Sequence, residues 1–226
     1  ALIGSRGVKE RREAGLFIAE GLQAAREALT SDGAPFIKSL YVTSHGLLKL
    51  SDFDLNEVDV IEVTDAVMSE MTSTVTPQGI LALCVVPRRE ISELKVLAEK
   101  KSARVIYLHE IQDPGNAGTI LRTADAMGVD AVITSPGSVD MYSPKVVRAT
   151  AGSLWHLPLY ESINVSELVE LLPEAKPLLL SSHATTSILD LPRENSYISV
   201  FGNEARGVDA SALGISPAAI TSVTIP

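Results

Sequence analysis

The sequence predicts an α/β fold in two parts, of which the second holds a largely parallel sheet. Short apolar segments rich in β-branched residues alternate with helical segments along the chain. The alternation is interrupted once, by the charge-dense stretch 88–103, and then starts again. Strands that alternate with helices are typical of a parallel sheet covered on both faces. We therefore expect domains at residues 1–87 and 104–226, joined by a linker or connecting helix at 88–103.

The first domain shows strands and helices in alternation. The segment GLQAAREALTSDG, residues 21–33, has the pattern of an amphipathic helix that Asp32 and Gly33 terminate. The remaining expected elements are strands at 16–20, 37–44, 58–64 and 78–86 and a helix at 65–72.

The second domain opens with the apolar strand RVIYLHEI, residues 104–111. A helix that ends near Met127 and Gly128 follows it. The further expected strands are 130–135, 157–160, 176–182, 196–202 and 220–226, and the further helices are 144–154 and 164–174.

The composition of the 226 residues, 46% hydrophobic and 21% charged, is ordinary for a globular chain. No apolar run reaches the ~18 residues of a membrane span, and no signal-peptide pattern opens the chain. Cys84 is the only cysteine and lies in an apolar strand, so we expect a buried, inert thiol. A reducing compartment fits, and we expect a cytoplasmic protein without membrane contact.

The formal net charge of −9 argues against a surface that is basic throughout, but local patches decide nucleic-acid binding. Two basic segments are candidates for RNA phosphate contacts, and each is equally compatible with a solvated helix face. Aromatic residues make up only 4% of the chain, so extensive base stacking is not expected. The candidate residues are Arg6, Lys9, Arg11 and Arg12 in the first segment and Lys145 and Arg148 in the second.

Several common kinds of site are not indicated. The four histidines are scattered without the spacing of metal ligands, so no metal site is expected. No G-x-G-x-x-G follows a strand and no Walker sequence is present, which argues against a dinucleotide-binding dehydrogenase and a P-loop enzyme.

The stretch IQDPGNAGTILRTADAMG, residues 111–128, predicts a strand end, a tight loop and a helix. Pro114 and Gly115 break the strand, and Asn116 is a candidate cap for the helix start. Arg122 lies about one and a half turns further along, at 3.6 residues per turn. A helix start with free N–H groups attracts anions, so this loop is a candidate site.

A second candidate site is VFGNEARGV, where a strand ends in Gly202-Asn203-Glu204 and Gly207 closes the turn. Ligands of open α/β sheets bind at the carboxyl ends of strands, and glycine lets the backbone approach a ligand closely. The terminal TSVTIP is a third strand end of this kind.

These segments together resemble one family. DPGNAGTILRTADAMGVDAVI, DMYSPKVVRATAGSLWHLPL, FGNEARGV and VTIP, in that order, are similar to the SpoU (TrmH) RNA ribose methyltransferases of the SPOUT superfamily. GLFIAEGLQAAREAL and TPQGILALCVVP resemble the substrate-binding domain, related to ribosomal protein L30e, that precedes many such enzymes.

The resemblance implies a C-terminal domain with a deep trefoil knot, a homodimer, and transfer of a methyl group from S-adenosylmethionine to a ribose 2′-OH of RNA. It makes Arg122 the catalytic arginine, with Asn116 and Glu204 arranging the site. In such dimers the arginine faces a cofactor that the partner chain holds. Cofactor contacts are implied for the knot residues Gly202, Asn203, Gly207 and Ile225.

Two roles for Arg122 remain open from its chemistry. Family accounts describe the matching arginine as a general base, but a guanidinium group resists deprotonation. We favour stabilisation of the forming alkoxide and a clamp on the adjacent phosphate. Glu204 is then a candidate proton acceptor or a structural partner of Arg122 or Asn116.

Two departures from the family pattern favour the non-catalytic one of two alternative interpretations. Residue 205 is alanine where the family usually has a second glycine, and the sequence ends at Pro226, before the family's Ser-Leu-Asn stretch and last helix. We expect poor cofactor binding if that tail is missing. The preferred substrate is ribosomal RNA, which the first domain recognises by shape. The alternatives are a non-catalytic RNA-binding or ribosome-assembly protein and an antibiotic-resistance methyltransferase.

Overall fold

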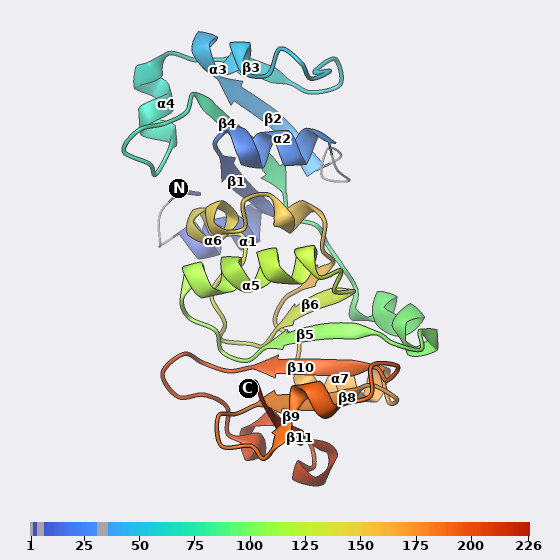
Figure 1. Cartoon of the computed structure of the whole chain (residues 1–226). Helices are drawn as coiled ribbons and strands as arrows, with labels where there is room; N and C mark the ends of the chain where they lie inside the picture. The colour runs from blue at the N-terminus through green and yellow to red at the C-terminus, as the bar shows by residue number, and fades with distance from the viewer. Residues whose placement is uncertain (1, 4–6, 31–35) are drawn as a thin grey trace. The chain divides into compact units, whose positions relative to one another are not determined.

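The computed structural model of the chain describes residues 2–3, 7–30 and 36–226 (Figure 1). The chain forms two compact units. The first comprises Ala1–Arg88, Pro114–Arg122 and Asp140–His156, and the second comprises Arg89–Asp113, Thr123–Val139 and Leu157–Pro226. Within the described ranges no helix has the length and apolar character needed to cross a membrane.

The first unit holds a four-stranded mixed sheet in the order β1-β4-β2-β3. Strand β4 is antiparallel to β1 and β2, whereas β2 and β3 are parallel. The strands are β1 Leu16–Glu20, β2 Ile37–Val42, β3 Val60–Glu62 and β4 Ile80–Val85. The helices are α1 Val8–Ala14, α2 Leu22–Thr30, α3 Ser44–Leu48, α4 Asp65–Met71, α6 Pro144–Ala149 and the 3₁₀ turn η4 Ser153–Trp155.

Aromatic side chains join β1 to the segment 140–156 in the core of this unit. The ring of Phe17, which is fully buried, lies 5.0 Å from that of Tyr142 and 5.5 Å from that of Trp155. The indole Nε1 of Trp155 donates to the carbonyl of Ala24 at 3.2 Å, so its polar atom is satisfied in the core.

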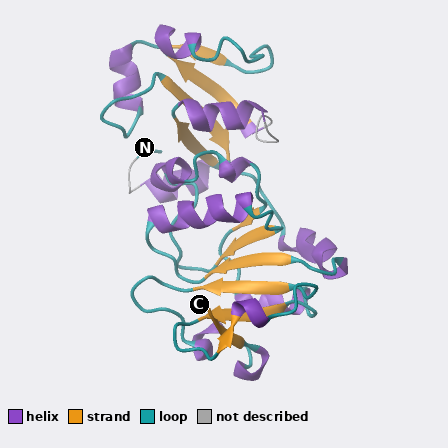
Figure 2. Ribbon diagram, in the orientation of Figure 1, coloured by secondary structure: helices purple, strands orange, loops and turns teal. Residues whose placement is uncertain are grey.

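The second unit contains a seven-stranded sheet in the order β7-β6-β5-β10-β8-β11-β9 (Figure 2). Every neighbouring pair is parallel, which confirms the predicted parallel α/β fold. The strands are β5 Arg104–Leu108, β6 Ala131–Thr134, β7 Leu159–Tyr160, β8 Lys176–Leu180, β9 Thr186–Ser187, β10 Tyr197–Phe201 and β11 Thr221–Thr224. The other elements are α7 Val165–Leu171 and the 3₁₀ segments η3 Ile91–Glu99, η5 Ile188–Asp190, η6 Ala210–Leu213 and η7 Pro217–Ala219.

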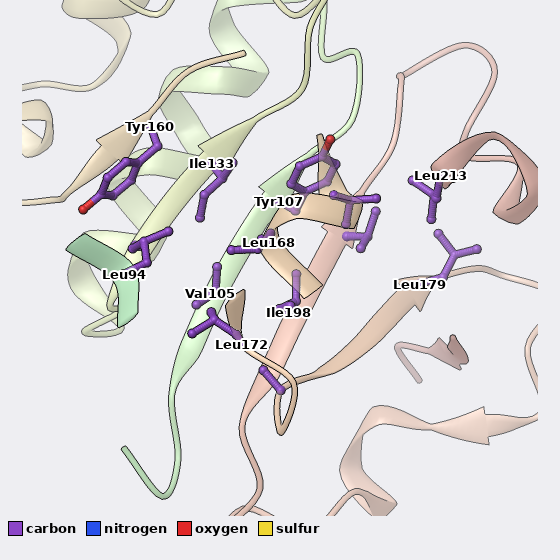
Figure 3. Close-up of a cluster of buried hydrophobic side chains, with 14 residues drawn as sticks. Leu94, Val105, Tyr107, Ile133, Tyr160, Leu168, Leu172, Leu179, Ile198 and Leu213 are labelled. Atoms are coloured by element: carbon purple, nitrogen blue, oxygen red, sulfur yellow. The ribbon is translucent and has the colours of Figure 1, made fainter. Parts of the chain in front are cut away.

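The core of the second unit lies between one face of this sheet and the segments α7 and η3 (Figure 3). Tyr107 of β5 and Ile133 of β6 pack with Leu168 of α7 and Leu94 of η3. Because β5 and β6 are buried along nearly their whole length, they read as continuous apolar runs in the sequence. Burial raises the pKa of Tyr107 to about 12.

The apolar pattern does not indicate the helices α1 and α3, the strand β9, or the 3₁₀ segments η5, η6 and η7. The expected helix at 144–154 ends at Ala149, because Ala151 (φ 50°) and Gly152 (φ 104°) turn the chain out of the helical conformation. A Cβ at Gly152 would lie 2.2 Å from Cγ of Glu27, so glycine is also required there by packing. Helix α5, Pro114–Ala126, runs from the first unit into the second.

Candidate active site

Helix α5 carries Asn116 and Arg122. The helix begins at Pro114, whose fixed φ suits the first helical position and whose missing N–H leaves no bond unmade there. The expectation that Asn116 caps the helix is therefore wrong, since Asn116 lies inside the first turn. Arg122 is exposed, and its side chain forms no hydrogen bond or ion pair with any described residue.

The opposite face of α5 packs closely on α6. A Cβ at Gly118 would lie 2.3 Å from Cβ of Ala149, and Ala117 and Leu121 are fully buried. Because this face is held by such tight contact, the exposed face is presented in a defined orientation. Lys145 of α6 is exposed.

The turn after β10 is built around Asn203, which is 8% exposed. Its Oδ1 accepts the backbone N–H groups of Ala205 (3.0 Å) and Arg206 (3.1 Å), and its Nδ2 donates to the carbonyl of Glu110 (2.9 Å). The N–H of Gly207 closes the turn on the carbonyl of Asn203 at 2.8 Å. Asn203 thus joins the carboxyl ends of β10 and β5.

The carboxylate of Glu204 binds the loop that leads into α5. Its Oε2 accepts the N–H of Gln112 at 3.2 Å and its Oε1 accepts the N–H of Asp113 at 3.1 Å. These two residues directly precede Pro114. The structure therefore gives Glu204 two backbone partners in the loop that precedes α5.

Glycine is required at position 202 by the path of this turn. A Cβ there would lie 2.4 Å from Cγ2 of Val208 and 2.6 Å from the carbonyl carbon of Gly207. Gly207 has a φ of 65°, in the left-handed region that favours glycine. The backbone conformation of the turn therefore explains why both positions hold glycine, whether or not a ligand binds there.

Two further residues of this edge were not found from the sequence. Glu110 has a φ of 51°, its N–H donates to Oγ of Ser135 at 2.8 Å, and its carboxylate pairs with Arg206 at 2.8 Å. A non-glycine residue in this region marks a constrained backbone. Two features of the sequence could have identified them as site residues: Glu110 lies at the end of a strand, and Arg206 lies inside the G-N-E-A-R-G segment.

Three strand ends meet at the edge where a cofactor is expected. Since β10, β8 and β11 are parallel neighbours, Gly202, Ser181 and Ile225 follow them at the same edge of the sheet. The side chain of Ile225 is 67% exposed. Asn203, Glu204 and Gly207 lie in the turn at this edge, whereas Asn116 and Arg122 belong to the first compact unit.

The basic residues named from the sequence divide into exposed and paired ones. Lys9 and Arg12 are exposed on α1, and Nζ of Lys9 lies 3.7 Å from Oε1 of the likewise exposed Glu13, a surface pair that leaves the ammonium group open to solvent. Arg11 is 2% exposed, and its Nη2 lies 2.6 Å from Oδ2 of Asp140, so it is not available to a phosphate. Arg148 is held by Glu20 at 2.9 Å. Arg6 lies outside the described residues.

Comparison with known proteins identifies the family. Residues 103–226, more than half of the chain, match the model of the SpoU rRNA Methylase family. The chain belongs to this family. Residues 5–82 match the model of the MRM3-like substrate binding domain.

Members of the SpoU family are also similar over most of the chain. The 23S rRNA (guanosine(2553)-2′-O)-methyltransferase RlmP of Bacillus subtilis is 32% identical over 91% of this chain and 78% of its own length. The human mitochondrial rRNA methyltransferase 3 is 28% identical over 76% of this chain and 40% of its own length.

Solved structures of the SpoU family have the same fold. AviRb of Streptomyces viridochromogenes, a SpoU methyltransferase solved with AdoMet, aligns with a TM-score of 0.83 at 21% identity over 100% of this chain and 86% of its own. An AdoMet-bound rRNA methyltransferase of Sinorhizobium meliloti aligns with a TM-score of 0.77 at 24% identity, over 96% of this chain and 81% of its own.

Proposed function

We propose that this SpoU-family chain transfers the methyl group of S-adenosylmethionine to a ribose 2′-OH of ribosomal RNA. The observation that carries the proposal is the Gly202–Gly207 turn, whose Glu204 binds the backbone that leads into the arginine-bearing helix. The similarity to RlmP, a 2′-O-methyltransferase of 23S rRNA, supports ribosomal RNA as the substrate.

The residues at the carboxyl edge of β10, β8 and β11 fit S-adenosylmethionine. Gly202 has no side chain to cover the backbone, and the exposed Ile225 offers an apolar contact at this edge. We assign Gly202, Asn203, Gly207 and Ile225 to cofactor binding. The bound cofactor supplies an electrophilic sulfonium methyl group, which the protein has to align with the ribose oxygen.

Arg122 stabilises the negative charge that develops on the ribose oxygen and clamps the neighbouring phosphate. Its guanidinium group is exposed and not engaged by any described residue, so its five N–H donors are available to RNA. A planar fork of donors suits both a phosphate and an alkoxide.

Glu204 and Asn116 are positioning residues in this proposal. Glu204 accepts two backbone N–H groups of the loop before α5, one on each carboxylate oxygen, and so fixes the path of that loop. Asn116 lies in the first turn of α5, where backbone donors lack partners inside the helix.

RNA affinity comes from exposed basic residues of the first unit, with Lys9, Arg12 and Lys145 as phosphate contacts. Residues 1–87 form the RNA-binding domain, 88–103 the connection and 104–226 the methyltransferase domain. The match of residues 5–82 to a substrate-binding domain supports this division. We further propose a homodimer, a trefoil knot in the methyltransferase domain, and a cytoplasmic location.

The test is methyl transfer from labelled S-adenosylmethionine to unmodified ribosomal RNA, followed by mass spectrometry of the nucleosides. We expect a 2′-O-methyl nucleoside with the wild-type protein and at least about 100-fold slower transfer with Arg122→Ala, because charge on the ribose oxygen loses its stabilising group. A base-methylated nucleoside, or no transfer despite RNA binding, would contradict the proposal.

The variant Arg122→Lys separates the two roles of the arginine. Lysine keeps the charge but loses the planar fork. A large loss of turnover with unchanged RNA affinity supports a role at the reacting oxygen, whereas equal losses in both would reduce Arg122 to a phosphate clamp.

A further inference from the structure

A cavity of about 220 Å³ opens in the first unit, between the start of α2, the loop 72–78 and the end of α6. No residue of the turn after β10 lines it. Polar side chains from the loop and α2 reach its wall, including those of Gln23, Thr74 and Thr76. The apolar part of the wall comes from Ala24, Pro77 and Ile80.

Among the described residues that line this cavity, Arg148 is the one cation, and an acidic side chain already neutralises it. Nη1 of Arg148 lies 2.9 Å from Oε2 of Glu20, which is 7% exposed, and 2.8 Å from Oγ of Ser73. The second oxygen of Glu20 accepts the N–H of Ser73 at 2.9 Å. This network holds the start of the loop in place and leaves the cavity without net charge, which is a poor environment for a phosphate.

The remaining polar groups suit a neutral ligand with donors and acceptors. The hydroxyls of Thr74 and Thr76 bond to no described residue, and a hydroxyl both donates and accepts. Nε2 of Gln23 donates to Glu27 at 2.7 Å, so its Oε1 remains as an acceptor at the wall. At the tip of the same loop the apolar side chain of Val75 is fully exposed, at 102%.

We propose that this cavity receives an unpaired nucleobase of the RNA substrate. The edge of a nucleobase presents the donors and acceptors that the threonine hydroxyls and the glutamine amide complement, and its faces fit the apolar wall. The inference rests on the proposed function, because it takes the ligand of the first unit to be the RNA that is methylated. It assigns sequence-dependent recognition to the loop 72–78, whereas the exposed lysines and arginines contact phosphates.

The test uses the double variant Thr74→Val and Thr76→Val, which removes both hydroxyls at nearly constant volume. We expect its affinity for unmodified ribosomal RNA fragments to fall about tenfold, which corresponds to one or two lost hydrogen bonds. The dependence of affinity on salt should not change, because no phosphate contact is lost. The control Ser51→Ala removes an exposed hydroxyl of the same unit outside the cavity and should bind RNA like the wild type.

Photocrosslinking locates the nucleotide directly. RNA that contains 4-thiouridine should crosslink to residues 72–78, and an abasic site at the crosslinked position should weaken wild-type binding about as much as the double variant does. Crosslinks only elsewhere, unchanged affinity of the double variant, or a reduced salt dependence would each overturn the proposal. Binding is measured in the Arg122→Ala background as well, so a failure of methyl transfer is distinguished from a failure of this site.

Discussion

At the scale of single residues, the structure separates side chains that build the site from those that remain available to substrate. Asn203 and Glu204 are occupied with backbone partners, whereas Arg122 is not engaged by any described residue. A sequence motif therefore contains residues that hold the backbone in place and residues that are available to substrate. The amino-acid sequence does not distinguish the two kinds, but the hydrogen-bond partners in the structure do.

The thiol of Cys84 provides a prediction at this scale. The side chain is fully buried in β4, and burial raises its pKa to about 12. Since the folded state favours the neutral thiol, this contribution to stability is present below the ordinary thiol pKa and is lost as the pH rises toward 12. We expect no measurable reaction with a thiol reagent at pH 8 in the native protein.

The measurement follows the colour released by a disulfide reagent before and after addition of urea. One thiol per chain should react once the protein unfolds. Rapid labelling of the folded protein would show that the strand opens readily, contrary to its complete burial.

At the scale of elements, α1 shows how neighbouring basic residues take different roles. Arg11 points inward, where its Nη1 donates to the carbonyl of Leu2 at 2.7 Å and its Nε to Oδ2 of Asp140 at the same distance. Arg12, the next residue, is exposed. Successive residues of a helix lie about 100° apart, so one helix can serve packing on one face and RNA on another.

The matched variants Arg11→Ala and Arg12→Ala test this division. Arg11→Ala leaves Asp140, whose side chain is 10% exposed, without its charge partner. We expect the free energy of unfolding to fall by about 3 kcal/mol, as measured by urea denaturation. Arg12→Ala should leave the free energy of unfolding within about 0.5 kcal/mol of the wild-type value. It should reduce the slope of the logarithm of RNA affinity against the logarithm of salt concentration by about 1, because one phosphate contact is lost.

The opposite result, an Arg11→Ala protein of unchanged stability that binds RNA more weakly, would show that Arg11 contacts RNA phosphates. It would also show that the Asp140 pair contributes little to the packing of α1.

At the scale of the whole molecule, the proposed homodimer leads to a prediction about how two inactive variants behave when they are mixed. In the proposed dimer Arg122 acts on a cofactor that the partner chain holds, so two defects in different chains can complement each other. We therefore expect Arg122→Ala and Gly202→Val, each inactive alone, to regain activity when they are unfolded together, mixed and refolded. If the two variants pair at random, about half of the dimers are heterodimers, and each heterodimer has one intact site out of two. The expected activity is therefore about a quarter of that of the wild type.

The measurement is methyl transfer to ribosomal RNA by the mixture, with the two variants refolded separately as controls. Activity no higher than that of the separate variants would place arginine and cofactor in the same chain. Circular dichroism of Gly202→Val checks that the clash with Val208 disturbs the turn and not the fold.

The parallel α/β class follows from the amino-acid sequence alone, because buried strands such as β5 and β6 require continuous apolar runs, and these runs are visible in the sequence. Motif likeness likewise identified the SpoU family and the loops after β5 and β10. Three roles became visible only in the folded chain: Arg11 pairs with Asp140, Glu204 binds the backbone before α5, and Arg148 neutralises Glu20. These roles depend on partners distant in the chain, and periodicity within a segment contains no information about which distant residue will lie beside it.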